Sequence, residues 1–77
     1  MTRFLEKLAE NCWFNKPTML AIVRPMESQD YIVISQEGKI VFGPNKFGSC
    51  AMFIKDKAKE QGFYYTIDDY KEKLNGN

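Results

Sequence analysis

The amino-acid sequence predicts a small two-layer α+β domain that spans residues 1–77. Three observations predict this class: three short apolar runs between residues 18 and 42, and apolar residues at helical spacing both before and after them. Runs that are rich in β-branched and aromatic residues, and bounded by Pro, Gly, Asp and Ser, are typical of antiparallel strands. We therefore expect a helix, a three-stranded antiparallel meander, a second helix, and a short C-terminal aromatic segment with a further helix.

The first predicted helix begins after Thr2 and ends before Pro17, which disfavours helical geometry at the residue that precedes it. The apolar residues at helical spacing are Phe4, Leu5, Leu8, Ala9 and Cys12. Trp13 and Phe14 follow at the helix end, and two such large rings cannot both share its packing face. One of them therefore either folds under the first strand or forms an exposed aromatic contact.

The three predicted strands cover residues 18–24, 31–35 and 39–42, and they are apolar on both faces. In the second strand, for example, Ile32 and Ile34 alternate with Tyr31 and Val33. A sheet with one face in water would instead alternate apolar with polar residues. Two helices are enough to cover one face of such a sheet. We expect the C-terminal segment, a second copy of the chain or a partner to cover the other.

The second helix is predicted after Asn45 or Ser49, either of which can cap it, and it ends at Gly62. Its predicted buried stripe consists of Phe47, Cys50, Ala51, Ile54, Ala58 and Gln61. Residues 63–65 are aromatic and predict a short fourth strand. Residues 66–74 begin with Thr and two acids, which is typical of a helix start.

The sequence contains none of the residue patterns of an enzyme or a metal site. It has no histidine, the commonest general base and metal ligand, and its two cysteines form no CxxC pair. The segment Gly43–Gly48 precedes a helix, but it lacks the Lys-Ser/Thr that a phosphate-binding loop requires. We expect a protein that is not an enzyme and that uses no cofactor and no metal.

The N-terminus carries charges where a signal peptide would be apolar, and the longest apolar run is Met19–Val23. Cys12 and Cys50 are too few for a disulfide framework. We therefore expect a complete small cytoplasmic protein with free thiols and no membrane partner.

The leading functional hypothesis is a protein-binding module, because the chain has more large apolar side chains than one small domain can bury. Interface cores favour Trp, Tyr, Phe and Met. The candidate partner-binding residues are Trp13, Phe14, Tyr31, Val33, Met52, Phe53 and Tyr64. We expect an accessory or inhibitor protein that binds a larger protein or itself, and its small size suits a phage- or plasmid-encoded factor.

The alternative hypothesis is nucleic-acid binding. The predicted order of helix, three strands and helix is similar to that of the double-stranded-RNA-binding domain, which implies contacts from lysines at the start of the last helix. The candidate lysines are Lys46, Lys55, Lys57 and Lys59. Of these only Lys46 lies at the helix start, the loop of residues 25–30 carries Glu27 and Asp30, and the net charge is only +1.

Overall fold

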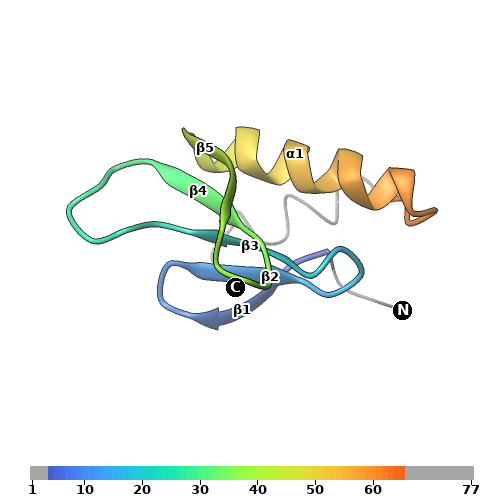
Figure 1. Ribbon diagram of the computed structural model, residues 1–77, viewed down its shortest axis with the longest axis horizontal. Helices are drawn as coiled ribbons and strands as arrows, with labels where there is room; N and C mark the ends of the chain where they lie inside the picture. The colour runs from blue at the N-terminus through green and yellow to red at the C-terminus, as the bar shows by residue number, and fades with distance from the viewer. Residues whose placement is uncertain (1–3, 66–77) are drawn as a thin grey trace.

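The computed structural model describes residues 4–65, which form an antiparallel five-stranded sheet followed by a helix (Figure 1). The elements are β1 (Glu6–Ala9), β2 (Cys12–Asn15), β3 (Leu20–Val23), β4 (Tyr31–Ile34), β5 (Ile40–Asn45) and α1 (Phe47–Glu60). Each strand pairs with the next one in the chain, so the sheet order is β1-β2-β3-β4-β5. The helix α1 lies across one face of this sheet.

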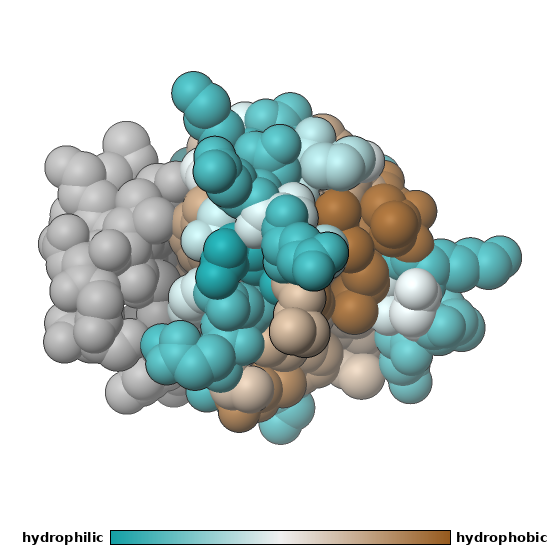
Figure 2. Space-filling view, turned by 90° about the vertical axis from the view of Figure 1, so that its left-hand side faces the viewer, coloured by the Kyte–Doolittle hydropathy of each residue, from teal (hydrophilic) through white to brown (hydrophobic). Residues whose placement is uncertain are grey.

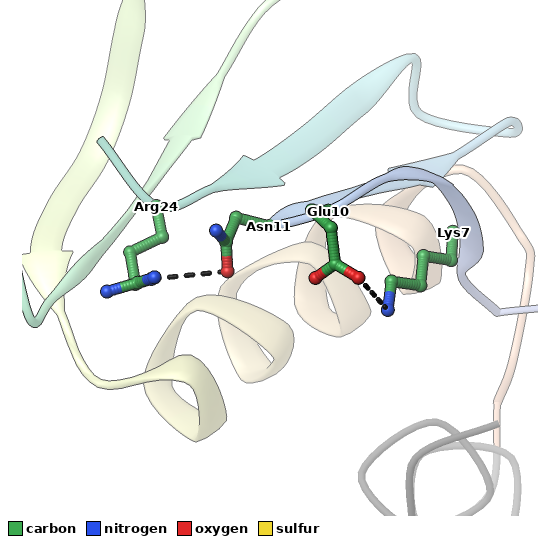
Figure 3. A network of polar contacts seen from close by, with 4 residues as sticks. All are labelled: Lys7, Glu10, Asn11 and Arg24. Carbon is green, nitrogen blue, oxygen red and sulfur yellow. Dashed lines mark hydrogen bonds and ion pairs between the residues drawn. The ribbon is translucent and has the colours of Figure 1, made fainter. Parts of the chain in front are cut away.

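The prediction of an N-terminal helix was wrong, because this part of the chain forms the hairpin of β1 and β2. Asn11 lies at the turn with a φ of +61°, a conformation that asparagine tolerates better than most residues. Arg24, which follows β3, forms two hydrogen bonds with this turn. Its backbone N–H donates to the Asn11 carbonyl at 3.0 Å. Its Nε donates to Asn11 Oδ1 at 3.2 Å (Figure 3). Pairing of β2 with β3 therefore outweighs the helical spacing of the apolar residues.

The three-stranded meander was also wrong as a description of the sheet. Its three predicted strands exist as β3, β4 and β5, but they belong to a five-stranded sheet. Because the chain starts with a hairpin instead of a helix, the similarity to the element order of the double-stranded-RNA-binding domain is lost. Residues 63–65 form no strand, and the further helix predicted over residues 66–74 lies outside the described residues.

The helix α1 lies where the second helix was predicted, with a different N-terminal cap. Lys46 is the N-cap residue and makes no capping side-chain bond, while Asn45 Oδ1 accepts a hydrogen bond from the Lys46 N–H at 2.8 Å. At the other end Gly62 has a φ of +89°, and its N–H donates to the Lys59 carbonyl at 3.0 Å. The helix therefore ends at the predicted glycine in a Schellman motif.

The core lies between α1 and the sheet. The paired residues Trp13, Ile22, Val33 and Phe42 form one row across β2 to β5 on the helix side. The fully buried residues are Phe4, Leu5, Ile22, Val33, Cys50, Ala51, Ile54 and Ala58. Four of the six residues in the predicted stripe of α1 belong to this set, whereas Gln61 is exposed.

A buried polar side chain, Asn15, connects three parts of the chain. Its Nδ2 donates to the Phe4 carbonyl at 2.6 Å and to the Tyr65 hydroxyl at 3.5 Å. Its Oδ1 accepts from the Thr18 hydroxyl at 2.6 Å and from the Thr18 backbone N–H at 3.1 Å. The hydrogen bonds of Asn15 thereby join the residues before β1, the β2–β3 turn and the segment after α1.

Substitution of Asn15 by alanine should lower the free energy of unfolding by about 2–4 kcal/mol, because it removes the four hydrogen bonds of a fully buried side chain. Urea denaturation measures this loss. The matched control is Asn45→Ala, which removes one bond from an exposed asparagine and should cost less than about 1 kcal/mol. Equal losses in the two variants would contradict the role given to Asn15.

Gly43 in β5 is required by the close approach of β4. Its φ is +96°, and a Cβ built on it would lie 2.8 Å from the Tyr31 carbonyl oxygen and 3.2 Å from the Ile32 Cα. Gly38, in the β4–β5 turn, has a similar φ of +84° but nothing within 4 Å of a Cβ. Alanine at Gly43 would therefore add both backbone strain and a steric clash, whereas alanine at Gly38 would add backbone strain alone.

Gly43→Ala should lower the free energy of unfolding by about 3 kcal/mol or more, since it adds a clash to the strain of a positive φ. Gly38→Ala should cost only about 1 kcal/mol, because it adds strain alone. Both losses are measured by chemical denaturation. If Gly43→Ala were as mild as Gly38→Ala, the tight β4–β5 packing described here would be wrong.

Candidate functional surfaces

The sheet face opposite α1, which we term the outer face, is apolar across β2 to β5. Residues that pair directly across antiparallel strands lie on the same face. One such row contains Cys12, Val23 and Ile32, and the next contains Phe14, Ala21, Ile34 and Ile40. Because Ile22 and Val33 point into the core under α1, both of these rows point away from it.

The outer face is accessible in this structure. Six of its seven apolar residues are half-buried, and Ile40 at the edge is 60% exposed. In Figure 2, strongly hydrophobic side chains gather in a continuous patch bordered by hydrophilic ones, on the side that carries the β1–β2 and β3–β4 turns. Within residues 4–65, the one helix packs on the opposite face, so no element of this part of the chain covers these rows.

A second apolar surface is a groove of about 660 Å³ between β5 and the first half of α1. Phe42 of β5 stacks on Phe53 of α1 with ring centroids 4.7 Å apart and planes inclined by 20°. Met52 lines the same groove and is 51% exposed. The remaining lining residues are Lys46, Gly48, Ser49 and Asp56. We refer to this surface as the β5–α1 groove.

The structure separates the seven candidate partner-binding residues. Trp13 and Tyr31 lie on the helix side with Phe47: the ring centroid of Phe47 is 5.0 Å from that of Trp13 and 5.3 Å from that of Tyr31. Val33 is fully buried in the core. These three residues therefore pack the interior of the domain.

The other four candidates lie on the surface but not together. Phe14 is on the outer face, Met52 and Phe53 line the β5–α1 groove, and Tyr64 is 73% exposed in the segment after α1. Most of the outer face, and Phe42 in the groove, are absent from the predicted set. The outer face could have been anticipated from β3 and β4, in which residues on both faces are apolar. The sequence does not show which of the two faces the helix covers.

An irregular β5 explains why Phe42 was missed. Ile40 pairs with Ile34 on the outer face, whereas Phe42 pairs with Val33 on the helix side. Regular alternation would put residues 40 and 42 on the same face, but the register shifts between these two pairs. The shift turns Phe42 toward α1.

The four candidate lysines for nucleic-acid binding differ in their surroundings. Lys46 lines the groove, and Lys59 is exposed. Lys57 is 5.5 Å from the Phe53 ring centroid and 3.9 Å from a carboxylate oxygen of Glu60. Lys55 is half-buried.

Both edges of the sheet are blunted against pairing with another strand. β1 has a register shift between Lys7 and Ala9, and β5 has two shifts and contains Pro44, which has no N–H to donate. Addition of a further strand at either edge is therefore disfavoured.

Residues 4–65 contain no group of three or more His, Cys, Asp or Glu that could hold a metal ion, and no helix among them is long and apolar enough to cross a membrane. Both cysteines are free thiols. No protein-family model, curated protein or solved structure matches this chain.

Cys50 is buried in the core, and its thiol donates to the Tyr31 carbonyl at 3.5 Å. Burial raises the pKa of this thiol, and the negative charge of Asp30 raises the pKa further. The thiolate, which is the reactive form, is therefore disfavoured at neutral pH. The Cys50 side chain belongs to the packed core of the domain.

The raised pKa of Cys50 should make stability depend on pH. The folded state keeps the thiol proton at a pH where the unfolded chain has lost it, so this contribution is complete below the ordinary thiol pKa and is lost as pH rises through the folded pKa. Unfolding of wild type and of Cys50→Ala, measured between about pH 7 and pH 10, should show their stability difference shrinking at the alkaline end. A difference that stays constant would contradict the raised pKa.

Proposed function

We propose that this protein is a non-enzymatic protein-binding module, an accessory protein whose outer face binds a second copy of the chain. The observation that carries the proposal is the pair of apolar rows on the outer face, which residues 4–65 leave uncovered. Burial of apolar surface is the main favourable term in most protein association.

The composition of the outer face favours a second copy over a transient partner. Its seven central residues carry no charge, and Glu6, which pairs with Phe14, lies only at the β1 edge. Transient interfaces are about as polar as the rest of a protein surface, whereas homodimer interfaces are more apolar. A face with an apolar centre is also complementary to itself, as a two-fold symmetric interface requires.

Two such sheets can pack face to face about 10 Å apart, as in β-sandwiches. In that arrangement α1 and the β5–α1 groove of each copy face away from the interface. The free thiols of Cys12 and Cys50 suit a reducing compartment, and we propose the cytoplasm as the site of action.

Analytical ultracentrifugation tests this function. Wild type should sediment at twice the monomer mass, and Ile34→Lys or Ile40→Lys should raise the dimer dissociation constant by about 100-fold or more, because each buries an unpaired charge. The matched control is Met26→Lys, at a loop residue that is 93% exposed and does not belong to the paired rows of the outer face. It should leave the dimer unchanged.

Circular dichroism should show that the lysine variants remain folded. If Ile34→Lys unfolds the protein, Ile40→Lys still tests the dimer, because Ile40 is already 60% exposed and tolerates a charge in the folded monomer. A second readout is Cys12, which lies in an outer row and should react with a thiol reagent more slowly in the dimer than in the Ile40→Lys monomer. A wild type that stays monomeric at all concentrations, or a dimer that both lysine variants preserve, would contradict the proposal.

A further inference from the structure

We propose that the β5–α1 groove is a second docking site, and that it binds an amphipathic helix of another protein. The helix would carry an acidic residue at one end of its apolar stripe and a basic residue at the other. This site lies on the opposite side of the sheet from the outer face, so the proposal does not depend on the proposed dimer. It concerns the contact with a different protein.

The groove has the properties of an apolar anchor site. The stacked rings of Phe42 and Phe53 line it, together with Met52, which is half-exposed. Methionine adapts its shape to different partner side chains. Lys57 lies 5.5 Å from the centroid of the Phe53 ring, which helps to hold that ring in place.

The two ends of the groove carry opposite charges. Lys46 lies at the N-terminus of α1, where the helix dipole is positive and the first turn contains no acidic residue. Asp56 lies at the other end, about 15 Å further along the helix axis. Among residues 4–65, neither side chain forms an ion pair. Both charges therefore remain available to complementary charges on a partner.

The form of the partner follows from the edge strand. β5 borders the groove, but its two register shifts and Pro44 prevent regular pairing with an added strand. A helix satisfies its own backbone hydrogen bonds and needs only side-chain contacts from the groove. To match Lys46 and Asp56, its acidic and basic residues should be about ten or eleven positions apart, with apolar residues between them on the same face.

Selection from a displayed library of helical peptides against the full-length protein tests this site. Wild type should select peptides with an apolar stripe between an acid and a base, and Met52→Glu should abolish their binding. With Lys46→Glu the selected peptides should become basic at both ends, and with Asp56→Lys acidic at both ends. Lys46→Glu and Asp56→Lys should each weaken binding of a wild-type-selected peptide by about two- to tenfold.

Matched controls are Lys59→Glu, at an exposed lysine of α1 outside the groove, and Glu37→Lys, at an exposed acid of the β4–β5 turn. Neither should change the selected peptides. Ile40→Lys should also bind them normally, which separates this site from the outer face. Peptides that bind independently of Met52, or whose charges ignore Lys46 and Asp56, would overturn the proposal. So would a dimer that Met52→Glu dissociates, because a second copy would then occupy the groove.

Discussion

The structure depends on the register that places Trp13, Ile22, Val33 and Phe42 in one row under α1. Side chains alternate between the two faces of a sheet wherever the pairing is regular, so this row also determines which residues of β2, β3 and β4 point outward. Those residues, Phe14, Ala21, Val23, Ile32 and Ile34 among them, are as apolar as the ones in the core. A single helix on one face therefore leaves a hydrophobic surface on the other within the described part of the chain.

The two proposed surfaces are compatible because they lie on opposite sides of the sheet. A dimer formed through the outer faces would present two β5–α1 grooves, one from each copy, both directed away from the interface. Two linked sites can bind a partner with two helices, or a partner that is itself dimeric, far more tightly than either site alone. Such an arrangement suits an accessory protein, which acts by engaging another protein instead of by chemistry of its own.

The sequence predicted the part of the fold in which local signals and tertiary packing agree. β3, β4 and α1 are bounded by turn or capping residues and lie close to their expected ranges. β5 begins as expected but extends to Asn45, beyond the expected end of the strand at Phe42. The N-terminal hairpin was missed because its apolar residues satisfy a helical spacing equally well. The deciding contacts, from β2 to β3 and from Arg24 to Asn11, join residues far apart in the chain. The role of Asn15 was missed for the same reason, since its partners include Phe4 and Tyr65.

The sequence indicated that the candidate surfaces are apolar, but it did not indicate which residues form each surface. The apolar nature of both sheet faces is visible in the alternation of β3 and β4, and Met52 and Phe53 lie off the buried stripe of α1. Which face the helix covers, and how the irregular β5 turns Phe42 toward Phe53, depend on packing that spacing alone does not encode. Trp13 and Tyr31 were therefore expected at a contact surface, whereas they surround Phe47 on the helix side.

The most direct measurement of the central claim is an isotope-filtered NMR experiment on a mixture of labelled and unlabelled protein, which detects contacts between copies only. The account predicts intermolecular contacts among the methyl groups of Val23, Ile32, Ile34 and Ile40 on the outer face. The account would be contradicted if no intermolecular contacts appear at high protein concentration, or if the contacts arise from Met52 and the groove instead.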